Sequence, residues 1–175
     1  DNFVKVGGYD FVIGSQHCVD NKELYYKTYF QGKTMKEIFR GYYDELLYNI
    51  TNFNNFDVVG HLDLIRRYSD EAVAFNFHEV MDRVEVILRK LISDGKGIEV
   101  NAGGFFYPTA MTNPHPSILK LYKELGGEII TYGSDAHVPQ KIGANYERTM
   151  DILKEAGFRY ISYFADRKVE FERIR

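Results

Sequence analysis

Short runs of apolar, β-branched and aromatic residues recur along the chain, and each run ends at a glycine or a polar residue. Runs of this length and composition are typical of buried strands. They predict five strands, at residues 9–14, 56–60, 97–101, 128–133 and 159–164.

Between these strands, apolar residues recur at every third or fourth position, which is the pattern of a helix with one buried face. Thr34 and Glu37 form a capping-box pattern at the start of the first helix, and Pro116 stands where a first helical turn tolerates proline. The predicted helices cover residues 34–50, 77–91, 116–125 and 146–156.

The regular alternation of strand and helix predicts the fold class, which is α/β. Strands separated by helices favour parallel pairing through right-handed crossover connections. Two architectures fit this order, an open doubly wound sheet and an incomplete α/β barrel. No repeat, low-complexity tract or linker interrupts the pattern, so we expect one domain over residues 1–175.

Composition and charge exclude several classes of partner. The 175 residues carry a formal net charge of -3, so the chain lacks the broad cationic surface that drives non-specific nucleic-acid binding. No apolar run approaches the roughly 20 residues that span a bilayer, and no membrane partner is expected. Cys18 is the single cysteine, which excludes an internal disulfide and fits a cytoplasmic protein. The chain opens at Asp1 without a methionine, so we expect a trimmed chain or a fragment.

Polar residues follow four successive predicted strands: His17, His61, Asn101, and the pair Asp135 and His137. In a parallel α/β fold the carboxyl ends of the strands lie on one rim, where α/β barrels place their active sites. We therefore expect these side chains to converge. A glycine precedes three of these groups, and we expect it to let the chain turn sharply out of the strand: Gly14, Gly60 and Gly133.

Histidine and aspartate are natural ligands for divalent zinc, iron and manganese. A single histidine near a strand end is more often a loop residue or a hydrogen-bonded core group. Three histidines and an aspartate at successive strand ends favour a shared metal site over coincidence. His78, beside the apolar stripe of its helix, is instead expected to be solvated or to cap the helix, and His115, between two prolines, to be a surface residue.

Four segments carry a resemblance to a known family: residues 9–17 (Tyr-Asp-Phe-Val-Ile-Gly-Ser-Gln-His), 60–63 (Gly-His-Leu-Asp), 98–101 (Ile-Glu-Val-Asn) and 133–137 (Gly-Ser-Asp-Ala-His). In order and spacing they resemble the strand-end motifs of histidinol phosphatases of the polymerase-and-histidinol-phosphatase (PHP) family. The resemblance implies a distorted, TIM-like barrel of seven α/β units, incomplete in this chain, and a cluster of usually three metals.

The resemblance also implies roles for individual residues. His17 and His61 match the two histidines of one metal site, Asp135 a ligand of a neighbouring metal and His137 the histidine of the third. Asp135 would also relay a proton, and His137 would help to stabilise the leaving oxygen. Both are therefore candidate catalytic residues.

Three further residues are candidates for substrate binding. Arg66 and Arg67 follow the His61 motif and would bind the substrate phosphate, a task that suits the planar fork of arginine. A solvated loop charge is the alternative for either one. Asn101 would orient a ligand or the substrate, or cap the local backbone.

Two departures from the family pattern bear on activity. The family opens with a His-x-His motif, further histidines and a bridging glutamate, and none of these occurs here; Glu99 is not a substitute, because it lies one strand too far along. We therefore expect weak metal binding and little or no phosphatase activity from the 175 residues. Phe105 and Phe106 stand where many relatives carry a basic residue.

The function implied by the resemblance is metal-dependent hydrolysis of a phosphate monoester, with L-histidinol phosphate, from histidine biosynthesis, as the leading substrate. The alternatives are a PHP phosphoesterase acting on nucleotides or nucleic acid, and a non-catalytic interaction module. An incomplete barrel exposes a strand edge, so a homodimer is a secondary hypothesis.

Overall fold

The parallel sheet is built from four strands in chain order. The computed structural model describes residues 2–175. β1 (Ile13–Gly14), β4 (Val58–Val59), β5 (Gly97–Asn101) and β6 (Ile130–Gly133) lie side by side in that order. All three pairings are parallel, as predicted. The sheet is open within the described residues.

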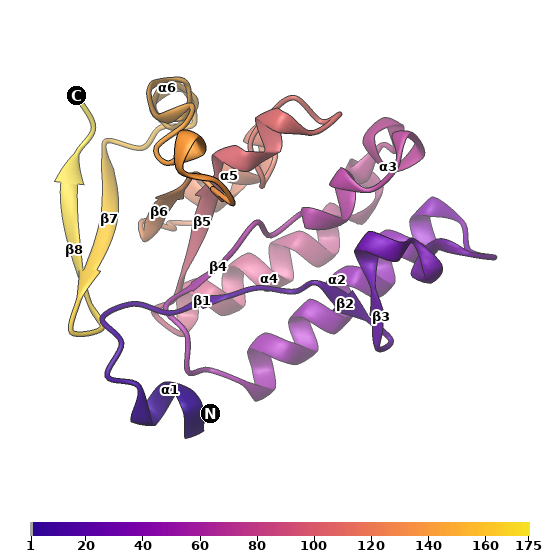
Figure 1. Ribbon diagram of the computed structural model, residues 1–175, viewed down its shortest axis with the longest axis horizontal. Coiled ribbons are helices and arrows are strands. Elements are labelled where there is room, and N and C mark those ends of the chain that lie inside the picture. Colours follow the sequence, from indigo (N-terminus) through magenta and orange to yellow (C-terminus); the bar gives the residue numbers. More distant parts are fainter. Residues whose placement is uncertain (1) are drawn as a thin grey trace.

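The four predicted helices are present, and three of them connect neighbouring strands of this sheet (Figure 1). They are α2 (Met35–Asn52), α4 (Met81–Ser93), α5 (Pro116–Glu124) and α6 (Tyr146–Glu155). The capping box is confirmed: the Glu37 N–H donates to the Thr34 hydroxyl at 3.3 Å, and the Thr34 N–H donates to the Glu37 carboxylate at 2.8 Å.

Short elements between these helices and strands were not predicted, because two to five residues give too little periodicity to recognise. They include four elements with regular hydrogen bonding: α1 (Asn2–Val6), β2 (Cys18–Val19), β3 (Lys22–Glu23) and α3 (Asp70–Ala74). β2 and β3 pair in an antiparallel hairpin directly after the first predicted site residue.

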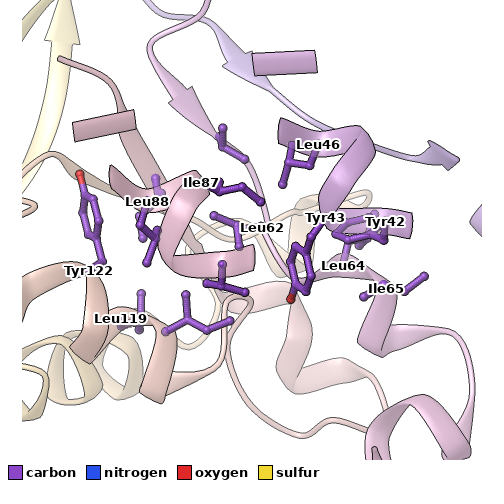
Figure 2. Close-up of a cluster of buried hydrophobic side chains, with 14 of the residues drawn as sticks. Tyr42, Tyr43, Leu46, Leu62, Leu64, Ile65, Ile87, Leu88, Leu119 and Tyr122 are labelled. Carbon is purple, nitrogen blue, oxygen red and sulfur yellow. The ribbon is translucent and has the colours of Figure 1, made fainter. Parts of the chain in front are cut away.

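The hydrophobic core fills the space between the sheet and its helices. Figure 2 shows side chains from α2, α4 and α5 pointing into one cluster around Leu62, which follows β4. The predicted apolar stripe of α2 is buried along its whole length: Ile38, Tyr42, Leu46 and Ile50. On α4 the buried positions again follow three-four spacing: Val84, Ile87, Leu88 and Leu91. This packing sets the positions of the strand ends.

The fifth predicted strand does not join the parallel sheet. β7 (Tyr160–Ala165) instead pairs antiparallel with β8 (Lys168–Arg173), a strand that was not predicted from the sequence. Asp166 and Arg167 connect the two, both with positive φ, at 50° and 62°. A two-residue turn with two positive φ angles matches the twist of an antiparallel hairpin and favours this local pairing.

The hairpin spans from one edge of the sheet to the other (Figure 1). Beside β6, the Ile130 N–H donates to the Ser162 hydroxyl at 3.1 Å. At the hairpin turn, Arg167 Nε lies 2.7 Å from Asp57 Oδ2, and the Arg167 N–H donates to the Asp10 carbonyl at 2.9 Å. The hairpin therefore fixes the segment before β1 against the amino ends of the parallel strands.

Within residues 2–175, every helix is too short or too polar to cross a membrane.

Candidate active site

The carboxyl ends of the four parallel strands bring the predicted site residues to one rim. The rings of His17 and His61 lie edge to face, with centroids 4.9 Å apart. Arg67 joins the ends of β5 and β6 through hydrogen bonds to Asn101 and Asp135. Residues that are far apart in sequence are thus neighbours in the fold.

His61 is held in a neutral, buried state. Its side chain is almost covered, with 6% of the residue exposed, and its φ of 28° lies in the left-handed region. Burial, followed by the positive charges of Arg67 and His17, lowers the pKa of His61 to about 4. Its Nδ1 is buried and finds no hydrogen-bond partner among the described residues. A neutral imidazole with an unused ring nitrogen is the form that binds a metal ion.

His17 lies in a loop that its neighbours hold in place. Gln16 is buried and donates from Nε2 to the Tyr42 carbonyl at 2.9 Å, while its Oε1 accepts from Asn49 Nδ2 at 3.0 Å. The His17 carbonyl accepts the Leu24 N–H at 3.0 Å. α2 and the β2–β3 hairpin therefore fix the backbone of His17, while its ring remains exposed to solvent.

Asp135 is ionised by its contact with Arg67. Its φ of 52° turns the chain at the end of β6, and its Oδ2 accepts from Arg67 Nη1 at 2.9 Å. Burial opposes ionisation of this carboxyl group, but the hydrogen bond and charge of Arg67 outweigh it and lower the pKa of Asp135. His137 Nε2 lies 3.6 Å from Asp135 Oδ1, with its side chain 85% exposed. His137 is thus the least constrained member of the predicted set.

Arg67 is the centre of the site. Its Nε donates to Asn113 Oδ1 at 2.6 Å and its Nη2 donates to Asn101 Oδ1 at 2.6 Å, in addition to the bond to Asp135. The guanidinium also lies over the Tyr107 ring, 4.8 Å from its centroid. A side chain with this many fixed contacts has one orientation.

Arg66 points into a different environment. Its Nη1 lies 3.4 Å from Asp63 Oδ2, and its guanidinium carbon lies 5.0 Å from the centroid of the Phe77 ring. The Asp63 carboxylate is fully buried and also accepts from Asn113 Nδ2 at 2.6 Å and from the His115 N–H at 2.9 Å. The two predicted arginines therefore do not lie together at the rim.

The predicted metal ligands form two pairs rather than a complete site. Across residues 2–175, three or more histidine, cysteine, aspartate or glutamate side chains nowhere gather as a group that could hold a metal ion. His17 with His61, and Asp135 with His137, are the pairs that the fold brings together. A catalytic zinc site normally uses three protein ligands, so each pair fits part of a site.

The sequence profile of the PHP domain matches residues 4–103, which is more than half of the 175-residue chain. The chain belongs to the PHP domain family.

This PHP chain is similar in sequence to histidinol phosphatases. The histidinol-phosphatase of Lactococcus lactis is 30% identical over 174 residues, covering 97% of this chain and 64% of that relative. A Thermotoga maritima protein described as a probable histidinol-phosphatase is 34% identical over 126 residues, covering 72% of this chain and 52% of the relative. The chain thus spans less than two thirds of the length of these relatives.

Solved structures show the same α/β fold with a parallel sheet. The Lactococcus lactis histidinol phosphate phosphatase, crystallised with Zn, L-histidinol and phosphate, has a TM-score of 0.86 and 30% identity, covering 97% of this chain and 65% of that one. A Listeria monocytogenes structure at 21% identity has a TM-score of 0.70 and supports the fold.

The glycines of the PHP motifs serve a purpose different from the one predicted. Gly14, Gly60 and Gly133 do not have φ in the left-handed region; His61 and Asp135 do. These glycines provide space instead. A Cβ on Gly60 would lie 2.5 Å from Ser15 Oγ, and a Cβ on Gly133 would overlap the Glu99 carboxylate.

Several residues that contact the predicted site residues were not predicted from the sequence. Asn113 and Tyr107 come from the segment between β5 and α5, which has no periodic pattern, and both contact Arg67. Asp63 lies within the Gly-His-Leu-Asp motif, and its position there was the available signal. His115, predicted at the surface, is half-buried, and its Nδ1 accepts from the Ser117 N–H at 3.2 Å to cap α5.

Proposed function

We propose that this chain carries part of the active site of a histidinol phosphatase, which hydrolyses L-histidinol phosphate to L-histidinol and phosphate. The observation that carries the proposal is the Arg67 fork, fixed beside the His17–His61 pair at the rim of a PHP fold. The likeness to the Lactococcus lactis structure with Zn, L-histidinol and phosphate supports it.

In this proposal Arg67 binds the phosphate group. An arginine has five N–H groups, and three of those of Arg67 donate to Asn113, Asp135 and Asn101. Two N–H groups of Arg67 are left to donate to phosphate oxygens. Asn101 orients Arg67 rather than contacting the substrate directly, and Arg66 supports the loop through its buried contact with Asp63.

The proposed metal ligands are His17, His61, Asp135 and His137. When bound, divalent metals such as zinc, iron or manganese polarise the phosphate ester and lower the pKa of water. The family pattern of three metals requires further ligands from outside residues 2–175, since the described residues supply only pairs. The fold that holds them is proposed to be an incomplete form of the distorted PHP barrel.

Asp135 and His137 are the proposed acid–base residues. The Asp135 carboxylate is ionised beside Arg67, so it can accept and relay a proton. The exposed His137 ring is 3.6 Å from that carboxylate and can turn towards the leaving oxygen of the substrate. At 3.6 Å the two groups are beyond direct hydrogen-bond distance, so a proton would pass between them after the ring turns or through one water molecule.

The test is phosphate release by the protein from its complete reading frame, with Zn²⁺ added and the 175-residue chain measured alongside. We expect kcat/KM for L-histidinol phosphate to exceed that for AMP by about 100-fold, a difference that specific contacts to the substrate produce. Equal or faster phosphate release from AMP, or release of nucleotides from a DNA 3′ end, would favour a PHP phosphoesterase of other specificity. Absence of hydrolysis of any ester by the zinc-loaded protein would favour a non-catalytic module.

Self-association is a separate proposal. β1 forms one edge of the parallel sheet, and an unpaired edge can pair with a second copy of the chain. Sedimentation equilibrium over a concentration series would detect a homodimer, and a constant monomer mass would exclude it.

A further inference from the structure

Glu99 is a buried carboxylate that the proposed reaction does not use. It lies in the middle of β5, where every residue is buried, and only 5% of it is exposed. A buried charge is costly unless hydrogen bonds compensate it. The contacts of Glu99 therefore indicate what it does.

Its first contact is with the backbone of His61. Glu99 Oε2 accepts the His61 N–H at 3.0 Å. The His61 φ of 28° is rare for a residue with a side chain, and such conformations persist only where the surroundings fix them. The hydrogen bond to Glu99 supplies one such constraint, and the direction of the imidazole depends on it.

Its second contact determines the orientation of the Asn101 amide. Asn101 Nδ2 donates to the same Glu99 oxygen at 3.2 Å. The amide oxygen must then face the other way, where it accepts from Arg67 Nη2 at 2.6 Å and from the Gly103 N–H at 3.0 Å. A flipped amide would place its N–H groups against those of Arg67.

The neighbouring strands leave room for the Glu99 carboxylate. A Cβ on Gly133, in β6, would overlap Glu99 Oε1, and a Cβ on Gly60, after β4, would lie 3.4 Å from Glu99 Oε2. Both glycines immediately precede site segments. The same positions that lead to His61 and Asp135 therefore also leave the space that the Glu99 carboxylate occupies.

We infer that Glu99 is a positioning residue: through one carboxylate oxygen it fixes the His61 backbone and the Asn101 amide, and through Asn101 it aims the Arg67 guanidinium at the substrate phosphate. This inference rests on the proposed function of Arg67. Hydrogen-bond acceptance by that oxygen, rather than negative charge, is the property that matters.

Two substitutions separate acceptance from charge. Glu99→Gln removes the charge but can place its amide oxygen where Oε2 lies and keep both hydrogen bonds. Glu99→Asp keeps the charge but withdraws the oxygens by one methylene group. Thr131→Val is the matched control, because Thr131 pairs with Glu99 across the β5–β6 register, is 5% exposed, and its hydroxyl has no hydrogen-bond partner among the described residues.

The measurements are KM for L-histidinol phosphate, Ki for inorganic phosphate, and kcat, on the zinc-loaded protein from the complete reading frame. We expect Glu99→Asp to raise KM and Ki by about 10- to 100-fold, as loss of a residue that orients a site residue does. Glu99→Gln and Thr131→Val should stay within about threefold of the parent. A purely structural role would reduce the folded fraction and hence apparent kcat, leaving KM and Ki unchanged.

The inference is overturned if Glu99→Asp keeps the parental KM and Ki, or if Glu99→Gln is impaired as strongly as Glu99→Asp. A parent that hydrolyses no L-histidinol phosphate refutes the proposed function, and the fixing of His61 and Asn101 by Glu99 then needs a test that does not depend on activity. In that case, or if Glu99→Asp does not fold in the protein from the complete reading frame, hydrogen exchange of the His61 amide in the metal-free 175-residue chain decides. Parental protection of this amide in Glu99→Gln supports the inference, and loss of the protection overturns it.

Discussion

At the scale of single residues, the adjacent arginines Arg66 and Arg67 differ in where their partners lie in the fold. Arg66 and Arg67 are both buried and both contact an aspartate and an aromatic ring. The partners of Arg67 come from the ends of β5 and β6 and from the segment after β5. Arg66 pairs with Asp63 within its own turn and reaches the segment after β5 only through Met111 Sδ, at 4.0 Å. Our proposal that Arg67 binds phosphate and Arg66 supports the loop rests on this difference.

Arg67→Lys is expected to raise KM for L-histidinol phosphate by about 10- to 100-fold, because an ammonium group cannot reproduce three fixed hydrogen bonds and still present donors to phosphate. Arg66→Lys is the control and should change KM by less than about threefold while lowering the urea midpoint. Steady-state kinetics and urea titration of both variants check this. A larger KM effect from Arg66→Lys would reverse the assignment.

The buried neutral His61 predicts a pH dependence of stability without metal. Its pKa is about 4 in the folded chain and 6.5 for the ordinary group, so the unfolded chain takes up a proton first as pH falls. The stability that neutral His61 contributes is complete above pH 6.5 and is lost between pH 6.5 and about 4. From pH 7.5 to pH 5 we expect a loss of about 2 kcal/mol. The Asp135 carboxyl, with its lowered pKa, loses its contribution only below this range.

Urea unfolding in EDTA at pH 7.5 and pH 5 measures this loss, and His61→Gln supplies the reference. Subtracting the variant removes the titration of all other groups. An equal change in both proteins would show that His61 titrates normally in the folded chain.

How far the sequence predicted the site depends on where each residue lies. His17, His61, Asp135 and His137 follow strands, so the strand pattern and the motifs placed them at the rim. Their supporting residues depend on side-chain direction, which periodicity does not encode. The sequence excludes Glu99 as a metal ligand, but its supporting role depends on two hydrogen bonds that the sequence does not predict.

At the scale of elements, the long helices follow from local signals. α2 begins at the predicted capping box and buries the predicted stripe. Thr34→Ala should lower the free energy of unfolding by about 1 kcal/mol, since it leaves the Glu37 N–H of the first turn without its side-chain partner. Thr34→Ser keeps the hydroxyl and should lie within a few tenths of a kcal/mol of the parent in urea titration. Equal stability of the alanine variant would show that water replaces the cap without cost.

The β7–β8 hairpin shows what an element pattern does not contain. The run at residues 159–164 forms a strand as predicted, but the predicted parallel pairing is wrong, because the strand pairs antiparallel with β8. Three of its six residues are exposed, Tyr160, Tyr163 and Ala165, and such partial exposure is typical of antiparallel strands with one solvated face. Parallel central strands are buried throughout, as β5 is. The difference in pattern was present in the sequence but weak over six residues.

Arg167→Met tests the attachment of this hairpin to the sheet. The substitution leaves the buried Asp57 carboxylate without its guanidinium partner, and we expect a loss of about 2 kcal/mol. Hydrogen exchange should increase across residues 160–173 more than in α2 or α4. Arg159→Met, at an exposed position in the same region, is the control and should leave exchange unchanged. If Arg167→Met does not increase exchange in residues 160–173 more than in α2 and α4, β7 docks without the Asp57 contact.

At the scale of the whole molecule, the described residues contain paired rather than complete metal ligands. The 175-residue chain is therefore expected to bind Zn²⁺ with a dissociation constant weaker than about 1 μM, which corresponds to roughly 8 kcal/mol. Isothermal titration calorimetry measures this, with a His61→Gln, Asp135→Asn double variant as the control for incidental surface binding. Tight binding of two or three equivalents would show that these residues complete the site by themselves.

The Arg67 hydrogen bonds have a consequence for how the protein is made. They join residues 34, 46 and 68 positions apart in the chain. Contacts over such distances require long loops to close, and the entropy of loop closure delays them relative to helices and local turns. A nascent chain can thus form α2 and α4 before Asp135 has been synthesised. The residues of the rim therefore come together in the last stage of folding. A mutation that stops folding early leaves helices without an assembled site.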